Sequence, residues 1–194
     1  QIAVERGQHA LQGGSQPTEV PTESPTEEPE PTLSPATGEN TVVYGDSVTV
    51  ASAAHLQELL PGVQIDAAVS RWVHEGIDLM HAAAEDGSLR TYVVVALATN
   101  GPVEPGQLDD MLKTIGPDRR LVLVTGFGPA RTTWVEPSAS LIREFAQKHS
   151  DVVRVADWNA AIRDHTDLLA SDYVHPDDDG AKIFAQTVVD ALAI

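Results

Sequence analysis

Apolar positions in residues 41–194 follow two alternating patterns. Short runs rich in β-branched residues occupy 41–44, 63–69, 91–97, 120–125 and 151–155. The third and fourth runs are almost continuously apolar, which is typical of strands covered on both faces. Longer stretches with helical character separate and follow the runs, at about 48–60, 71–86, 106–115, 136–149, 157–169 and 178–192.

This alternation predicts right-handed βαβ units, and so a three-layer α/β/α sandwich with a five-stranded parallel sheet. In an open sheet of this kind, functional residues gather in the loops beyond the carboxyl ends of the strands. We therefore expect the polar residues that follow the first four runs to share one edge of the domain: Asp46 and Ser47, Ser70 and Arg71, Thr99 and Asn100, and 126–131.

The first 40 residues have a different composition. Residues 15–40 hold six of the 13 prolines of the chain, together with Thr, Ser and Glu, and offer little to bury. We predict a Pro/Thr/Glu-rich linker over 1–40, disordered or extended, and one folded domain over 41–194. The chain begins at Gln1 without the layout of a signal peptide, so we expect a piece of a longer protein whose missing part is N-terminal.

Charge and cysteine content narrow the function classes. The formal net charge is −17, and such an acidic surface repels phosphate backbones and anionic lipid headgroups. Nucleic acid is therefore not an expected partner. The absence of cysteine excludes disulfides, thiolate catalysis and zinc–thiolate sites, but does not decide the compartment. We expect a monomer.

Ser47 is the first candidate for chemistry. The stretch TVVYGDSVTVASAA predicts a strand that ends at Gly45-Asp46-Ser47 and turns into a helix. That turn would hold the Ser47 hydroxyl at the carboxyl edge of the sheet, a suitable place for a nucleophile. Asp and Ser are also common helix N-cap residues, so an ordinary helix start is the alternative.

Asp172 and His175, in SDYVHPDDDG, supply the base that a serine nucleophile needs. At this spacing the aspartate can accept from imidazole Nδ1–H while Nε2 faces the serine. The alternative is a turn-capping aspartate beside a surface histidine. Asn100, in ALATNG, can donate to a developing oxyanion, and its alternative is a turn asparagine, because Asn-Gly is a common turn dipeptide.

The order G-D-S, then T-N-G, then D-x-x-H-P resembles the SGNH/GDSL hydrolase family over about residues 41–194. The GDSV, LATNG and DYVHPDDDG motifs, with the Ser-Arg pair at 70–71, are similar to the extracytoplasmic domain of peptidoglycan O-acetyltransferases. In those proteins a membrane acyltransferase-3 domain precedes a spacer and an SGNH domain. The resemblance implies a flavodoxin-like fold, with the following roles: Ser47 as nucleophile, His175 as base, Asp172 as its orienter, and the Ser47 N–H with Asn100 as oxyanion hole.

Some positions depart from the family pattern. The family's second block commonly has a glycine that contributes an N–H to the oxyanion hole, and Ser70 takes that position here, with a narrower choice of backbone geometry. Ala98 and Gly101 flank Asn100 where the family often has G-x-N-D, and Trp72 follows Arg71 where this branch often has Gln. These differences bear on acceptor identity more than on chemistry.

Two further residues are candidates for substrate contact. Arg71 can bind substrate or form a structural ion pair, and Trp134, in GPARTTWVEP, can stack on a sugar or pack against the domain. The Asp run at 177–179 precedes the last predicted helix, and the helix dipole explains it without a calcium site. We expect no metal and no organic cofactor.

The leading hypothesis is a serine-dependent O-acetyltransferase domain on the extracytoplasmic face of the bacterial membrane. It would pass an acetyl group through acyl-Ser47 to a hydroxyl of a cell-wall glycan, with peptidoglycan as the expected acceptor. A membrane acyltransferase domain absent from this chain would deliver the acetyl group, and water would make the domain an esterase in vitro. The alternatives are a carbohydrate acetyl-esterase or lipase-like esterase, and an inactive glycan-binding module.

Overall fold

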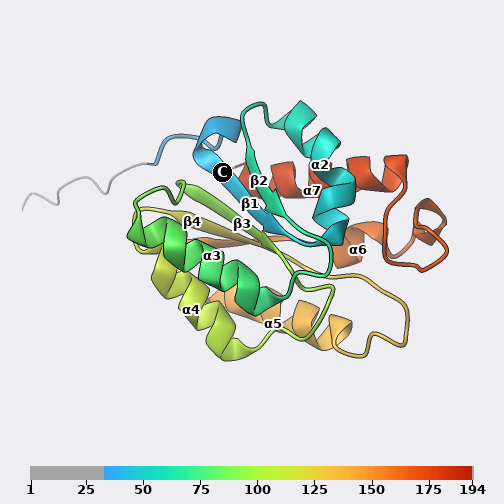
Figure 1. Ribbon diagram of the computed structural model, residues 1–194. Helices are drawn as coiled ribbons and strands as arrows, with labels where there is room; N and C mark the ends of the chain where they lie inside the picture. Colours follow the sequence, from blue (N-terminus) through green and yellow to red (C-terminus); the bar gives the residue numbers. More distant parts are fainter. Residues whose placement is uncertain (1–32, 194) are drawn as a thin grey trace, which may run out of the picture. The chain divides into compact units, whose positions relative to one another are not determined.

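A five-stranded parallel sheet forms the centre of the domain in the computed structural model, which describes residues 33–193 (Figure 1). The strand order is β2-β1-β3-β4-β5. The strands are β1 Thr41–Gly45, β2 Gln64–Ala67, β3 Tyr92–Ala96, β4 Arg120–Val124 and β5 Val153–Ala156. The predicted α/β sandwich with five parallel strands is confirmed.

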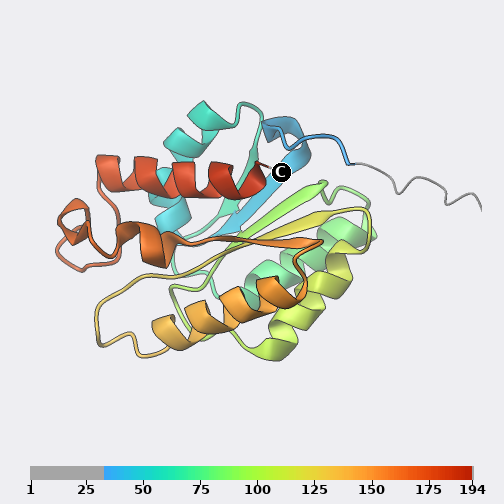
Figure 2. The same cartoon turned by 180° about the vertical axis from the view of Figure 1, so that it is seen from behind.

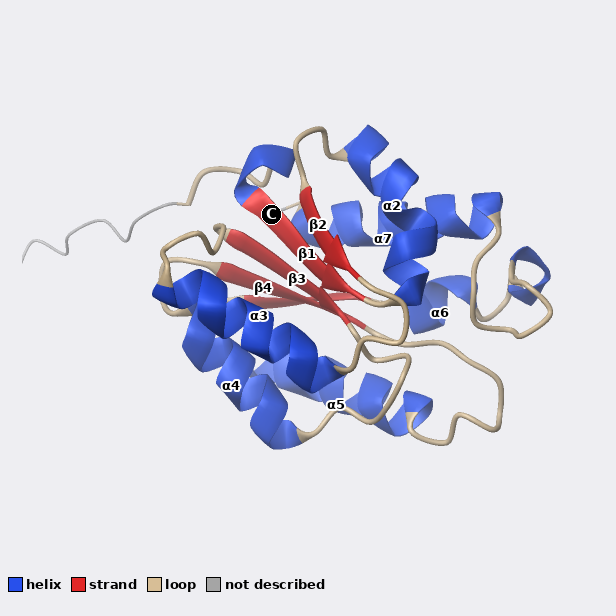
Figure 3. Cartoon of the chain, in the orientation of Figure 1, coloured by secondary structure: helices blue, strands red, loops and turns tan. Residues whose placement is uncertain are grey.

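Helices cover both faces of this sheet (Figures 1 and 2). One layer holds α2 (Ser47–Leu59), the short α6 (Trp158–Ile162) and α7 (Asp178–Leu192). The opposite layer holds α3 (Val73–Glu85), α4 (Pro105–Ile115) and α5 (Val135–Lys148). Figure 3 shows the three layers directly, with the strands in red between the blue helices.

Alternate residues of the central strands enter two separate cores. Val42 and Tyr44 of β1 pack toward α3 and α4, whereas Val43 packs toward α2 and α7. Every residue of β1 and β3 is buried, because helices cover both faces of these strands. This burial on two sides explains why the sequence of β3 is almost continuously apolar.

The topology brings the loops that carry the site to one edge of the sheet. The chain runs from β1 through α2 to β2 on one side of β1, and then through α3 to β3 on the other side. Gly45, at the end of β1, is in register with Ala67 of β2 and Ala96 of β3. The three loops that follow therefore start at one level, at the point where the chain changes direction, which is where open α/β sheets place their ligand sites.

The helices that adjoin the site are tied to each other. On one face of the sheet α2 and α7 lie side by side (Figures 1 and 2). His55 of α2 hydrogen-bonds Asp178 in the first turn of α7, with 3.0 Å between Nε2 and Oδ1. Because α2 begins at Ser47 and α7 follows His175 closely, this packing of the two helices fixes the position of Ser47 relative to His175.

The predicted helix at 157–169 is wrong in length. Helix α6 ends at Ile162, and a separate 3-10 turn, η2, spans Thr166–Leu168. The residues between them, Arg163-Asp164-His165, lead into a segment of Asp and Thr that favours turns over helix. His165 leaves helical geometry at φ −129° and ψ 38°, and the chain turns toward the loop that carries His175.

The predicted linker falls mostly outside the described residues, which begin at Leu33. Its last residues are described, and they contact the domain: the Tyr92 hydroxyl donates to the Ser34 carbonyl at 2.7 Å, and the 3-10 turn η1 spans Gly38–Asn40. Contacts of the domain therefore extend upstream of Thr41. Within residues 33–193, no helix combines the length and the apolar character needed to cross a bilayer.

Candidate active site

Ser47 is the first residue of α2, directly after the N-cap residue Asp46. The Asp46 Oδ1 accepts from the Val48 N–H at 2.9 Å, and the Asp46 N–H donates to the Ala96 carbonyl at 3.2 Å. Gly45 allows the sharp strand-to-helix turn, because a Cβ there would lie 2.2 Å from Thr49 Oγ1. The alternative interpretation, an ordinary helix start with an N-cap residue, is therefore also correct. The same turn presents the Ser47 hydroxyl at the edge of the sheet.

Three side chains form a continuous hydrogen-bonded chain. The Ser47 Oγ lies 2.9 Å from His175 Nε2, and His175 Nδ1 lies 2.6 Å from Asp172 Oδ2. Ser47 and His175 are 128 positions apart in the sequence, so only the fold brings them together. In this arrangement the aspartate holds the proton on Nδ1, which leaves Nε2 free to accept the proton of the serine.

The electrostatics of Asp172 suit this role. Its hydrogen bond with His175 is the main cause that lowers the pKa of the Asp172 carboxyl from 3.8 to about 2. The N–H groups of Val174 and His175 contribute as well, donating to Oδ1 at 2.9 and 3.1 Å. The carboxylate is therefore ionised at every pH at which an esterase assay is run.

The loop around the base is held by its own backbone. The Ala170 N–H donates to the His175 carbonyl at 2.8 Å, and the Tyr173 N–H donates to the Ala170 carbonyl at 2.9 Å. Arg131, from the loop after β4, donates to the Asp172 carbonyl at 3.3 Å. The imidazole thus projects from a closed turn, which fixes its direction.

Two backbone N–H groups and one side-chain amide are the predicted oxyanion donors. Ser70 has φ +62°, the left-handed conformation that glycine adopts most easily, so the serine keeps the backbone geometry expected of a glycine. The Asn100 Nδ2 donates to the Arg71 carbonyl at 3.1 Å, which holds Asn100 against the segment that contains Ser70. One amide hydrogen uses that contact, and the second remains for a substrate oxygen.

The two predicted substrate contacts turn out differently. The Arg71 guanidinium pairs with Asp66, at 2.8 Å between Nη2 and Oδ1, and also donates to the Asp66 carbonyl. The Trp134 Nε1 donates to the Thr99 carbonyl at 3.1 Å, beside Asn100. Both geometries favour the structural alternatives that the sequence left open, an ion pair for Arg71 and packing for Trp134.

Exposed side chains near the site were not predicted. Trp72 is 48% exposed, and its ring lies over Gly101, where a Cβ would come within 2.4 Å of the ring. Tyr173, between Asp172 and His175, is 52% exposed and has φ 59°. The sequence carries only a weak signal for Tyr173, namely an aromatic residue inside the D-x-x-H motif.

Asp46 has a second feature that the sequence does not reveal. Its Oδ2 is buried without a hydrogen-bond partner, as is the Trp158 Nε1, and both residues line one small cavity behind the nucleophile. Burial is the largest influence and raises the pKa of the Asp46 carboxyl, although the Val48 N–H donates to Oδ1 and acts in the opposite direction. Ionisation of the Asp46 carboxyl is therefore less favourable in the folded protein than in water.

An ion pair supports the far side of the same edge. Arg143 of α5 donates to both carboxylate oxygens of Asp157, each at 2.8 Å, and Thr125 donates to Oδ1 at 2.9 Å. Burial acts to raise the pKa of Asp157, but the bonds from Arg143 and Thr125 outweigh it and lower the pKa. Thr125 and Asp157 directly follow β4 and β5, so this pair joins the ends of two strands.

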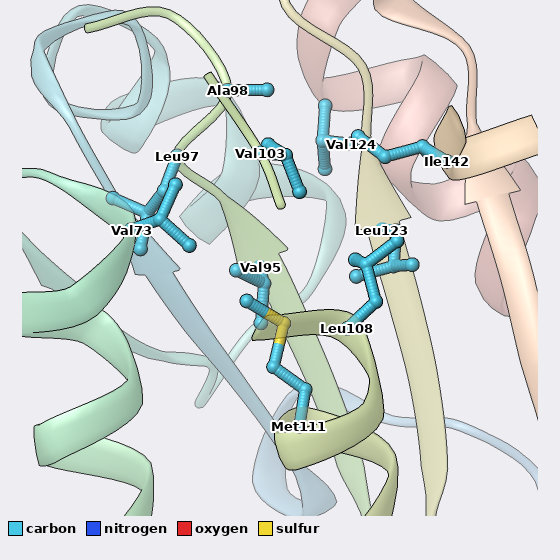
Figure 4. Close-up of a pocket in the computed structure, with 10 residues that line it drawn as sticks. All are labelled: Val73, Val95, Leu97, Ala98, Val103, Leu108, Met111, Leu123, Val124 and Ile142. Carbon is cyan, nitrogen blue, oxygen red and sulfur yellow. The ribbon is translucent and has the colours of Figure 1, made fainter. Parts of the chain in front are cut away.

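An apolar pocket lies in the core between β3, β4 and α4 (Figure 4). Val95, Leu108, Met111 and Leu123 point into it, and none of its lining residues belongs to the Ser47–His175–Asp172 chain or to the oxyanion donors. We interpret it as a packing void. Among residues 33–193, no three histidine, aspartate or glutamate side chains converge closely enough to hold a metal ion.

Comparison with known proteins defines the class in which this site occurs. No family model matches the chain. A solved SGNH hydrolase from Slackia heliotrinireducens, described as putative, superposes with a TM-score of 0.60 at 22% identity, over 79% of this chain and 98% of that chain. At that identity the likeness concerns the fold, and the fold is that of the SGNH hydrolases.

More similar matches narrow the class. The C-terminal catalytic domain of peptidoglycan O-acetyltransferase A (OatA) from Streptococcus pneumoniae has a TM-score of 0.73 and 30% identity, with 81% of this chain and 94% of that domain covered. The putative peptidoglycan O-acetyltransferase YrhL of Bacillus subtilis is 25% identical over 156 residues, 80% of this chain and 24% of that protein. The chain belongs to the SGNH hydrolase family, in the group of peptidoglycan O-acetyltransferase catalytic domains. It spans about a quarter of the length of the curated relatives it matches.

Proposed function

We propose that this domain is a serine O-acetyltransferase that moves an acetyl group onto a hydroxyl of a cell-wall glycan, with peptidoglycan as the acceptor. The observation that carries the proposal is the chain of contacts from Ser47 through His175 to Asp172, at 2.9 and 2.6 Å. The choice of acetyl as the acyl group, and of peptidoglycan as the acceptor, rests on the similarity to peptidoglycan O-acetyltransferases.

In the first half-reaction, the Ser47 Oγ attacks the carbonyl carbon of the acetyl donor while His175 Nε2 takes the serine proton. The carbonyl oxygen becomes an oxyanion, which the N–H groups of Ser47 and Ser70 and the Asn100 amide stabilise. When the intermediate collapses, the donor's leaving group departs with the proton from His175. Acetyl-Ser47 remains. The positive end of the α2 dipole, at Ser47, adds to the stabilisation of negative charge.

In the second half-reaction, a glycan hydroxyl gives its proton to His175 Nε2 and its oxygen attacks the acetyl carbonyl. Collapse releases the Ser47 oxygen, which recovers the proton from His175, and the acetyl group leaves as a glycan ester. Water in place of the glycan hydroxyl gives acetate, so the domain should act as an esterase when no acceptor is present.

The experiment compares transfer with hydrolysis. With an activated acetyl ester as donor, we expect a soluble oligomer of N-acetylglucosamine to become acetylated and the yield of free acetate to fall by the same amount. A Ser47→Ala variant should give neither product above background. Acetate formation that is unaffected by any concentration of saccharide would favour a hydrolase instead. Saccharide binding without reaction of wild type toward the ester would favour a binding module.

The remaining partners follow from the same kinship. We propose that the domain acts on the extracytoplasmic face of the bacterial membrane, and that a membrane acyltransferase domain outside this chain delivers the acetyl group. A full-length protein that contains such a domain should acetylate the wall of the cell that produces it. Loss of that modification on Ser47→Ala replacement in the full-length protein would be the supporting result, and unchanged wall acetylation would contradict it.

A further inference from the structure

Five large apolar side chains are at least two-fifths exposed among the described residues. Two of them, Val50 and Leu59, lie on α2, and the other three, Val69, Trp72 and Tyr173, lie in or beside the loops at the carboxyl edge of the sheet. An apolar side chain that is exposed beside a catalytic group is a candidate for contact with a ligand. Of the three, Tyr173 belongs to the loop that carries the base.

The backbone at Tyr173 is in an unfavourable conformation for its residue type. Its φ is 59°, in the left-handed region, where a bulky residue is a true outlier and glycine would be at ease. The hydrogen bonds of Ala170, Tyr173 and His175 close the turn and hold this conformation. A side chain that makes its own backbone less stable, and is half exposed, contributes little to the fold. Strain retained beside a catalytic residue indicates function.

We propose that Tyr173 is an acceptor-binding residue, whose ring forms a platform for one sugar ring of the glycan while a hydroxyl of that glycan reaches His175. This inference rests on the proposed function. The acceptor must approach His175 Nε2, because that atom takes its proton. The Cα of a residue two positions away lies at most about 7 Å from that of His175, so a sugar over Tyr173 is within reach of the imidazole.

The chemistry of the ring matches a neutral glycan. A tyrosine presents a flat apolar face with a polar tip, and it loses little side-chain entropy when it contacts a ligand. The apolar C–H face of a pyranose can cover such a ring. The Arg71 guanidinium is paired with Asp66 and the Trp134 Nε1 donates to the Thr99 carbonyl, whereas the Tyr173 side chain is 52% exposed.

The test separates acceptor binding from folding. Tyr173→Gly removes the ring and relieves the left-handed strain, Tyr173→Leu keeps the strain and an apolar side chain, and Tyr173→Phe keeps the ring. We expect the acceptor KM, measured with an N-acetylglucosamine oligomer, to rise roughly three- to tenfold in Tyr173→Gly and Tyr173→Leu. It should stay near wild type in Tyr173→Phe and in the control Leu59→Ala, which removes a comparably exposed side chain from α2.

A merely structural role predicts a different pattern. If the turn alone matters, Tyr173→Gly should match wild type in acceptor KM, and that result would overturn the inference. Acyl-enzyme formation from an activated ester, and the thermal midpoint of Tyr173→Gly, separate a folding defect from lost binding. If wild type itself forms no acyl-enzyme, the proposed function fails and this inference falls with it. If wild type transfers acetyl groups and the glycine variant does so with unchanged KM, only the role of Tyr173 is refuted.

Discussion

Replacement of Asp172 by asparagine tests how the base is set up. The two oxygens of Asp172 have separate tasks: Oδ1 accepts from the N–H groups of Val174 and His175, and Oδ2 accepts from His175 Nδ1. The amide oxygen of Asp172→Asn can keep the two backbone bonds. Its NH₂ group then faces Nδ1, which must accept instead of donate. The neutral imidazole is forced to carry its proton on Nε2, the atom that faces Ser47.

The expected magnitude follows from this change of tautomer. A base protonated on Nε2 cannot accept the Ser47 proton, and the same substitution in serine protease triads lowers kcat about 10⁴-fold, or roughly 5.5 kcal/mol in barrier height. The fold should change little, because the backbone bonds remain. The Asp172 side chain is 41% exposed, so solvent screening limits the stability lost with its charge to at most about 1 kcal/mol.

The assay is the pre-steady-state rate of acylation by an activated acetyl ester, with the thermal midpoint measured on the same samples. Asp172→Ala is the matched control, since it also removes the acceptor of the Val174 and His175 N–H groups. It should lose similar activity and also lower the midpoint. Retention of acylation within tenfold of wild type by a folded Asp172→Asn variant would refute the assignment of the orienting role.

Three further predictions concern neighbouring groups. Asn100→Ala should lower the acylation rate about 10²- to 10³-fold with little change in the urea midpoint, and a loss below fivefold would remove Asn100 from the oxyanion hole. Ser70→Ala should retain activity, because the backbone N–H of residue 70 is the proposed donor. Ser70→Gly should retain activity as well, and should gain stability because glycine adopts φ +62° without strain. A large loss of rate in Ser70→Ala would instead implicate the Ser70 hydroxyl. Burial raises the pKa of Asp46 above 3.8, so its ionisation destabilises the fold as pH rises through and above that value. Asp46→Asn keeps an N-cap acceptor and should be at least as stable as wild type at pH 7, with the difference shrinking as pH falls toward 3.8 and absent below it. Urea midpoints across pH that show the opposite trend would contradict this.

Much of the fold could be predicted from the sequence for a physical reason. Strands buried on both faces need apolar residues at every position, so β3 and β4 are visible as continuous runs. Parallel strands place their following loops at one edge, which is why Ser47 and Asn100 could be expected to lie near each other, and the loop before the last helix, with Asp172 and His175, can return to that edge. The geometry of the Ser47–His175–Asp172 chain agrees with that expectation.

Other features depend on contacts that no local pattern encodes. The Asp and Thr residues after Ile162 disfavour helix, but α6 ends at Ile162 itself where the chain turns back toward the His175 loop. The pairing of Arg71 with Asp66 depends on the loop geometry after β2. The left-handed backbone of Tyr173 contradicts the preference of its residue type, and such contradictions arise where function overrides local stability.

The proposed acetyl transfer depends on one step above all, the covalent attachment of the acetyl group to Ser47. Mass spectrometry of peptides from protein quenched early in its reaction with an activated acetyl ester tests this most directly. We expect one acetyl group per chain, on the peptide that contains Ser47, and no such label in Ser47→Ala or His175→Ala. A product burst that survives in Ser47→Ala, or a label on a different residue of the wild type, would contradict it.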